Sequence, residues 1–256
     1  MYKILFFMLS FVICQETTTF DKGVSYYNNR HEGANGLIPS EDNITKAISI
    51  FESLQQPYDT SEQDRQSGEY LIKSYYFMAQ YVVQSKDDKK MYFQLAKDLS
   101  ERYIHKYPDS VEFLYWNLAT MSNWAKLIGV IKLTKLGAAD NYREKAVDII
   151  VLDPMHEDGG GYFLLGAVYF TAPYIPLLIT WHDDNKAVQY FSRAVDTGRA
   201  TPLQMIYLAK ALLKTDQKDA ALDVLKRIMN TSPSLTNYIE DSHYIHEAKT
   251  LWDKEF

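Results

Sequence analysis

Residues 202–235, PLQMIYLAKALLKTDQKDAALDVLKRIMNTSPSL, decide the fold of this chain. Ala209 and Ala221 are small residues twelve positions apart, and large apolar residues lie about one helical turn from each of them. Two antiparallel helices that cross closely need a small residue on each helix at the crossing and large residues to fill the groove beside it. Pro233 then closes the unit. The stretch therefore predicts a tight helical hairpin.

This pattern is that of a complete tetratricopeptide repeat, and looser copies of it precede the stretch. The small residues at the first-helix crossing recur at separations of 40, 47 and 43 residues, and they are Ala79, Ala119, Gly166 and Ala209. The competing interpretation is an ordinary amphipathic hairpin. We predict an all-α fold: a right-handed α-solenoid of degenerate tetratricopeptide-like helical hairpins, with two long insertions and a C-terminal capping helix that covers the last groove.

Three segments are expected along the chain. Residues 1–14 have Lys3 followed by a short apolar run, which is typical of an export signal and too short to span a bilayer. Residues 15–40 are polar with several glycines, and they predict an extended segment with little regular structure. Residues 41–256 form the tetratricopeptide-like helical domain. The alternative for residues 1–14 is a short buried helix in an intracellular regulator.

The lone cysteine, Cys14, excludes a disulfide framework within one chain. Its place at the end of the apolar run leaves two expectations open. Either Cys14 is removed with the signal and the mature chain begins at Gln15, or Cys14 carries a lipid, although Ile13 fits that motif badly. The expected location is periplasmic or secreted, with a lipid anchor in the outer membrane as the second case.

The charge of the chain argues against a role in binding nucleic acid. The net charge is −6, and the chain has no basic stripe or arginine-rich tract that would neutralise phosphates. Tyrosine is abundant at 20 residues. These tyrosines either fill the seams between helices or form an aromatic ligand surface.

Two insertions interrupt hairpins and are apolar for connections between helices. They span residues 124–141 and 171–184 and break their hairpins at the same place, so both are expected on the same edge of the solenoid. Surface connections are usually polar. These segments therefore either line a pocket or a contact between subunits, or pack on their own solenoid. The candidate ligand-binding residues are Trp124, Lys132, Tyr174, Trp181 and His182.

Lysines recur among the apolar residues of the first insertion at Lys126, Lys132 and Lys135. They either meet an anionic ligand group at a pocket mouth or extend from an amphipathic helix into solvent.

Catalytic and metal-binding motifs are weak. His156-Glu157-Asp158 precedes three glycines, but it lacks the second histidine of a metalloprotease helix and the lysine of a phosphate loop. His182-Asp183-Asp184 and His243-x-x-His246 each supply too few ligands for a structural metal site. We therefore expect no catalytic residues, no metal and no cofactor. An enzyme built around His156, Glu157 and Asp158 is the competing hypothesis.

Several further runs share one pattern over roughly residues 40–235. They are Tyr162-Phe-Leu-Leu-Gly166-Ala-Val-Tyr169 with Ala172-Pro173 and Pro176, then Lys186-Ala187, Tyr190-Phe191 and Arg193-Ala194, then Leu114-Tyr115-Trp116-Asn117-Leu118-Ala119 with Trp124, and Asp153-Pro154 before the glycines. These runs are similar to the T component (TatT) associated with tripartite ATP-independent periplasmic (TRAP) transporters, and their motifs are shared in part with tetratricopeptide proteins generally.

The resemblance implies a periplasmic lipoprotein that assembles as a homotrimer, docks a periplasmic solute-binding protein and passes a small apolar or organic-acid ligand. Ile13 before Cys14 and Leu177-Leu178-Ile179 in the second insertion depart from the family pattern. The expected function is therefore that of an exported helical-repeat protein that binds a protein partner and a small apolar or anionic ligand. The alternative is a protein–protein interaction scaffold of the cell envelope with no small-molecule ligand.

Overall fold

A computed structural model describes residues 18–56, 58–129, 138–172, 175 and 179–256, with the side chain of Ala138 left out. The described residues are all-α: they form helices, and their β-structure is limited to the isolated bridges Asn35–Ile38 and Ile175–Ile179. The predicted class is confirmed. None of the described helices is both long enough and apolar enough to span a membrane.

The helices have the following bounds: α1 (Thr19–Asn28), α2 (Asp42–Ser53), α3 (Glu62–Phe77) with its π-helical extension η1 (Met78–Val82), α4 (Lys86–Lys106), α5 (Val111–Ile128), α7 (Ala138–Leu152), α8 (Gly160–Thr171), α9 (Asp184–Val195), α10 (Pro202–Lys214), α11 (Lys218–Met229) and α12 (Tyr238–Glu255).

Local capping explains where several of these helices begin. The hydroxyls of Ser61 and Ser85 accept hydrogen bonds from the third backbone N–H of α3 and α4. Thr201 forms a capping box with Gln204, and Pro202 occupies the first turn of α10, where a missing N–H costs nothing. These signals are local in the sequence, so they hold before any tertiary contact forms.

The segment predicted to be extended contains a helix, so the expectation for residues 15–40 was wrong over residues 19–28. α1 begins at a capping box formed by Thr18 and Asp21 and packs against α2 as the first helix of a hairpin. Gly23, which suggested a break, permits this packing. A Cβ atom there would lie 2.8 Å from the ring of Phe51, so only glycine lets the two helices approach so closely.

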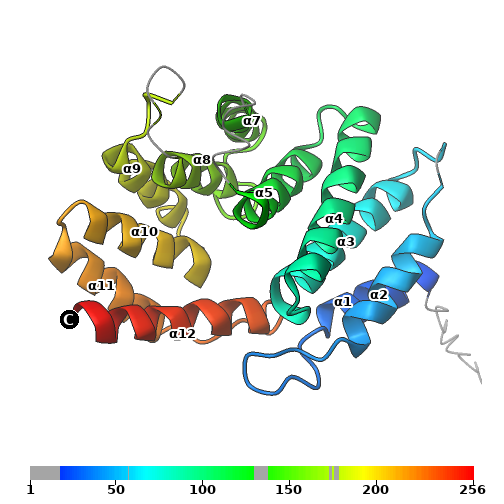
Figure 1. Cartoon of the computed structure of the whole chain (residues 1–256). Helices are drawn as coiled ribbons and strands as arrows, with labels where there is room; N and C mark the ends of the chain where they lie inside the picture. The colour runs from blue at the N-terminus through cyan, green and yellow to red at the C-terminus, as the bar shows by residue number, and fades with distance from the viewer. Residues whose placement is uncertain (1–17, 57, 130–137, 173–174, 176–178) are drawn as a thin grey trace, which may run out of the picture.

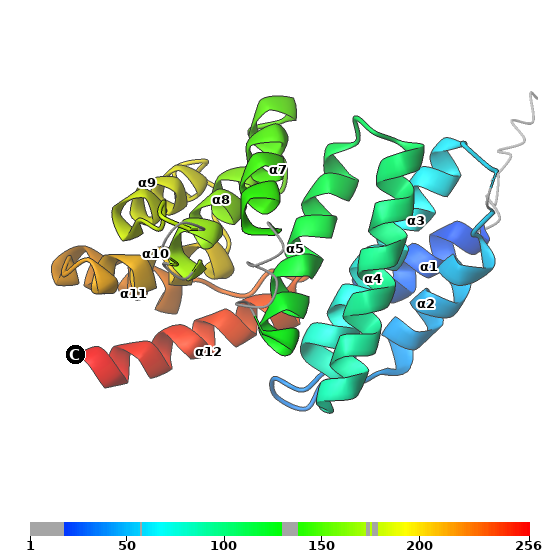
Figure 2. The same ribbon diagram turned by 45° about the horizontal axis from the view of Figure 1, so that its top comes forward.

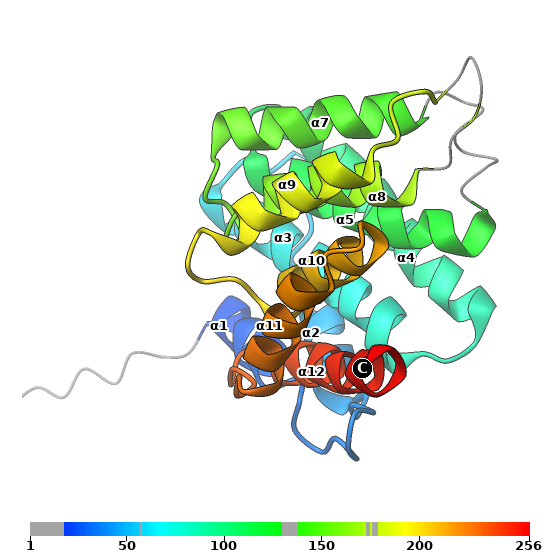
Figure 3. The ribbon, with the colours of Figure 1, turned by 90° about the vertical axis from the view of Figure 1, so that its left-hand side faces the viewer.

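The helices follow one another around an arc, and α12 closes it (Figure 1). The chain passes from α1 and α2 through α5 and α8 to α10 and α11, and the segment after α11 then returns to the side of α1. α12 begins there and runs back to the C-terminus beside α11 (Figures 1 and 2). Seen from the side, α7 and α12 lie at opposite edges of the molecule (Figure 3).

α12 joins two separate hydrophobic clusters. One contains Phe51, Phe113 and other residues of α2–α5, and Ile239 at the start of α12 belongs to it. The other is built from α5 to α11, and Tyr244, Ile245 and Ala248 belong to it. One face of a single helix is therefore buried in both clusters, which ties the two ends of the arc together.

The described parts of the two insertions pack on neighbouring elements. Residues 124–128 end α5 and residues 138–141 begin α7, so the described part of the first insertion is helical apart from Gly129. In the second, the backbones of Ile175 and Ile179 pair at 2.9 and 2.8 Å. The indole N–H of Trp181 donates to Asp140 Oδ1 at 2.9 Å. The two insertions thus meet on one edge, as their positions in the sequence predict.

Glu112, at the start of α5, accepts hydrogen bonds from Ser110 Oγ and from Arg65 Nη1 of α3, both at 2.6 Å. Partial burial favours the neutral carboxyl, but these bonds outweigh it and lower the pKa of Glu112 to about 2. The pKa is about 4.3 in an unfolded chain. The ionised group therefore stabilises the fold above that pH, and this contribution is lost as the pH falls from about 4.3 toward 2.

We expect Glu112→Gln to lower the free energy of unfolding by about 1–2 kcal/mol at neutral pH, a value reduced for the solvent screening of a partly exposed pair. The difference from wild type should shrink as the pH falls below about 4.3. Urea titrations of both proteins from neutral pH down to the acid transition measure it. A difference that stays constant with pH would contradict the assignment.

Candidate functional site: a tyrosine-lined cavity

The inner side of the arc encloses a cavity with a volume of about 630 Å³. This is within the range of about 300–1,000 Å³ that small-molecule sites occupy. Its walls come from the end of α1 and from α3, η1, α5, α7, α8, α10 and α12. No pattern in the sequence predicts this cavity, because its two sides come together only when α12 closes the arc.

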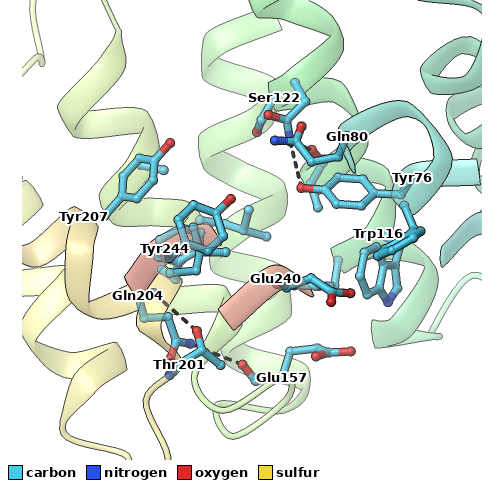
Figure 4. Close-up of a pocket in the computed structure, with 18 of the residues that line it drawn as sticks. Tyr76, Gln80, Trp116, Ser122, Glu157, Thr201, Gln204, Tyr207, Glu240 and Tyr244 are labelled. Carbon is cyan, nitrogen blue, oxygen red and sulfur yellow. Dashed lines mark hydrogen bonds between the residues drawn. The ribbon is translucent and has the colours of Figure 1, made fainter. Parts of the chain in front are cut away.

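Tyrosine dominates the walls. The tyrosines that line the cavity are Tyr27, Tyr70, Tyr76, Tyr81, Tyr115, Tyr142, Tyr207 and Tyr244, and Trp116 joins them. Figure 4 shows Tyr76 and Trp116 on the opposite side of the cavity from Tyr207, with Tyr244 between them. Aromatic faces bind apolar or flat groups, and the phenol hydroxyls add hydrogen bonds at the ring edges. The abundance of tyrosine was the signal in the sequence, and part of it serves this surface.

Burial raises the pKa of four of the lining tyrosines, Tyr76, Tyr115, Tyr142 and Tyr244, above the ordinary value of about 10, so these four phenols remain protonated at neutral pH. Neutral side chains of α5 bond two of these hydroxyls: Asn123 Nδ2 donates to Tyr76 Oη at 2.9 Å, and Ser122 Oγ lies 2.6 Å from Tyr142 Oη. The cavity thus offers neutral donors and acceptors rather than phenolate charge.

Charged side chains on the walls are mostly paired. Arg30 Nη2 lies 2.5 Å from Glu240 Oε1, and Lys210 forms an ion pair with Glu247. Lys73 Nζ lies 2.5 Å from Glu69 Oε1 and 3.7 Å from Glu157 Oε1. Paired charges are kept in place by their partners, so these residues shape the walls without leaving a large net charge inside.

Arg30 closes the cavity between the end of α1 and the start of α12. Its side chain is only 2% exposed, and it donates to Glu240 Oε1, Asn237 Oδ1 and the backbone oxygen of Tyr27. Its guanidinium also lies 4.3 Å from the centre of the Tyr27 ring. Burial raises the pKa of Glu240, and the Arg30 charge opposes that rise. The sequence offers no local signal for this pair.

A strained turn presents Glu157 to the cavity. Glu157 and Asp158 have φ values of 47° and 54°, and Gly159 follows at 82°. Consecutive left-handed residues other than glycine are costly, and surrounding contacts must hold them. Gln204 Nε2 donates to the backbone oxygen of Asp158 at 2.9 Å, and Arg199 pairs with the Asp158 carboxylate at 2.7 Å.

The His156-Glu157-Asp158 group does not converge on one point. The His156 ring packs edge-on against the Tyr115 ring, with 5.4 Å between the ring centres. Glu157 faces Lys73, and Asp158 pairs with Arg199. In the described part of the chain, no three His, Cys, Asp or Glu side chains gather so as to hold a metal ion.

The candidate residues from the sequence lie elsewhere. Trp124 is half-buried on α5 and does not line the cavity. Trp181 packs against the Tyr169 ring and under Arg143, and His182 Nε2 lies 3.4 Å from Asp184 Oδ1. Lys132 and Tyr174 lie outside the described residues. The structure therefore does not bring the described candidates into the cavity.

Sequence comparisons add no relative. No protein-family model matches this chain, and no curated protein matches it.

Proposed function

We propose that this protein is an exported helical-repeat binding protein that holds a small apolar or amphiphilic ligand in the tyrosine-lined cavity and acts without covalent chemistry. The observation that carries the proposal is the cavity itself, which has aromatic walls, paired charges and a volume suited to a small molecule. A tightly packed helical protein does not need such a space for stability, because unfilled volume forfeits packing energy.

The proposal includes a right-handed solenoid of tetratricopeptide-like hairpins. Two contacts support it. Ala209 and Ala221 are fully buried where α10 meets α11, and a Cβ atom on Gly166 of α8 would lie 2.8 Å from the Phe191 ring of α9. Small residues thus stand at the helix crossings, as this repeat type requires.

The resemblance to the T component of TRAP transporters extends the proposal to location and partner. It implies a periplasmic or secreted protein, a solute-binding protein as the partner and a trimeric assembly. The apolar run before Cys14 supports export. Each of these expectations is separate from ligand binding in the cavity and is tested separately.

We expect the neutral fluorescent probe N-phenyl-1-naphthylamine to bind the purified protein at one site and to fluoresce more strongly there. Ala119 lines the cavity, and Ala119→Trp would fill much of it. We expect this variant to bind the probe at least about tenfold more weakly, a loss of about 1.4 kcal/mol or more, because the indole would occupy the space of the probe. Fluorescence titration measures the change.

Ala220→Trp is the matched control, because Ala220 is exposed on α11 and does not line the cavity. It should bind the probe like wild type. Circular dichroism of the three proteins establishes that each is folded. If the probe does not bind, or if both variants bind it equally well, the cavity is not a ligand site.

An envelope scaffold that binds only proteins is the alternative function, and one observation favours it. Val147 and Val151 on α7 and Met155 after it are 43%, 77% and 49% exposed, which is unusual for apolar residues so close together in sequence. Native mass spectrometry of the protein from its own host separates the two functions. A bound small molecule supports the cavity, whereas a ligand-free chain that retains a protein partner supports the scaffold.

A further inference from the structure

The charges on the cavity walls are unevenly distributed along its length. Figure 4 shows Ser122 at one end and Glu157 and Thr201 at the other, and these ends are named here the Ser122 end and the Glu157 end. α5 runs past both, because Tyr115 and Trp116 of its first turns and Ser122 and Lys126 of its later turns all line the cavity.

The Glu157 end carries more acid than base. Glu157 and Glu240 line the cavity toward this end (Figure 4), and Glu69 lies 2.5 Å from Lys73, so three carboxylates stand against the two cations Arg30 and Lys73. Arg30 forms an ion pair with Glu240. Lys73 has two carboxylates, those of Glu69 and Glu157, within ion-pair distance. A ligand carboxylate placed here would therefore meet excess negative charge in a partly enclosed space, where like-charge repulsion is weakly screened.

The Ser122 end carries more base than acid. Lys210 pairs with Glu247 there, one helical turn after Tyr207 on α10. Lys126 Nζ contacts only neutral groups among the described residues, Asn123 Oδ1 at 3.2 Å and Tyr207 Oη at 3.4 Å. Among the residues that the structure does not describe, 130–137, 173–174 and 176–178 contain no Asp or Glu, and Glu16 is the one acidic residue of 1–17. Arg30, Lys73 and Lys210 each pair with a carboxylate, whereas the described residues supply none within ion-pair distance of Lys126.

We propose that the cavity binds an amphiphilic monocarboxylate, with its carboxylate at Lys126 and Tyr207 and its apolar body along the tyrosine-lined walls toward the Glu157 end. This inference rests on the proposed function and assigns the ligand's class and orientation. Lys126 supplies the counter-charge, and the Tyr207 hydroxyl donates a second hydrogen bond to the same carboxylate. The apolar body then gains by leaving water for the aromatic walls.

Displacement of bound N-phenyl-1-naphthylamine by decanoate, decanol and decylamine tests the proposal, since these ligands share one chain and differ in head group. We expect decanoate to displace the probe at about fivefold lower concentration than decanol, because a partly exposed ion pair is worth up to about 1 kcal/mol. Decylamine should be the weakest of the three, and added salt should reduce the advantage of decanoate.

Lys126→Met should bring decanoate to within about twofold of decanol and leave decanol unchanged, since only the charged head loses its partner. Tyr207→Phe keeps the ring and should reduce the advantage of decanoate in part. Lys46→Met is the matched control: it removes the same charge from α2, where Lys46 lies over the Tyr26 ring and outside the cavity. In this variant decanoate should still displace the probe at about fivefold lower concentration than decanol.

The outcomes separate this inference from the function on which it rests. Equal displacement by decanoate and decanol, stronger displacement by decylamine, or an advantage that survives Lys126→Met would overturn the carboxylate assignment while ligand binding stands. Failure of the probe and of all three amphiphiles to bind would instead remove the proposed function itself.

Discussion

Arg30→Ala is expected to lower the free energy of unfolding by about 3–5 kcal/mol, the range for removing one partner of a buried ion pair. The guanidinium makes hydrogen bonds to Glu240, Asn237 and the backbone of Tyr27, and its side chain is only 2% exposed. Alanine would leave the Glu240 carboxylate half-buried without its counter-charge. It would also leave a void beside the Phe77 ring, which lies 5.1 Å from the guanidinium carbon.

The loss should be concentrated at the first turns of α12, because Arg30 holds that end of the helix against the end of α1. Chemical denaturation measures the change in stability. Hydrogen exchange measures its location, with faster exchange expected for the α12 amides near Ile239 and a smaller effect near Ala248, which stays packed in the other cluster. The closed cavity depends on this contact, so probe binding should weaken in the same variant.

Arg65→Ala is the control for a partly exposed arginine. Arg65 also pairs with two carboxylates, Glu62 and Glu112, but its side chain is 30% exposed. We expect a loss of about 1 kcal/mol. If Arg30→Ala cost no more than Arg65→Ala and left exchange in α12 unchanged, the closure of the arc would not depend on Arg30.

Phe191→Ala is expected to cost about 3–5 kcal/mol, the range for truncating a fully buried phenylalanine. The ring fills the crossing of α8 and α9. Its centre lies 5.7, 6.1 and 5.8 Å from the ring centres of Phe163, Phe170 and Tyr207. Val147→Ala, at a half-exposed position on α7, should change stability by no more than about 0.5 kcal/mol. Thermal and urea unfolding compare the two.

Gly166 should be coupled to Phe191, which tests the crossing itself. A Cβ atom on Gly166 would lie 2.8 Å from the Phe191 ring, so Gly166→Ala should cost about 1–3 kcal/mol despite the better helix propensity of alanine. In the Phe191→Ala background the same change should be neutral or stabilising, because the clashing ring is gone. Additive effects in this double-mutant cycle would mean that the two residues do not meet as described.

Most helices could be predicted from the sequence because their signals are local. Serine and threonine caps begin α3, α4 and α10. Ala209 and Ala221 lie where two helices cross, and the buried positions of these helices repeat every three or four residues. α1 was missed because a glycine normally weakens a helix. The reason for Gly23 lies on another helix, in the Phe51 ring that occupies the space of its Cβ atom.

The candidate site could not be predicted in the same way. An apolar or aromatic residue in an insertion is equally compatible with lining a pocket and with packing on its own fold, and only its neighbours decide. Trp181 illustrates this, because its indole N–H donates a hydrogen bond to Asp140 and its ring packs against Tyr169 and Arg143. The tyrosines that do line the cavity come from α1, α3, η1, α5, α7, α10 and α12, and no spacing in the sequence groups them.

The sequence by itself determined that the chain is helical, and local caps fix where α3, α4 and α10 begin, because caps, helical periodicity and small residues at crossings act over a few residues. Only the tertiary structure decided that α12 closes the arc and that a cavity lies inside it. The contact responsible joins Arg30 to Glu240 across 210 positions. Such a pair leaves no periodic trace, since its energy comes from burial and geometry that exist only after the helices have packed.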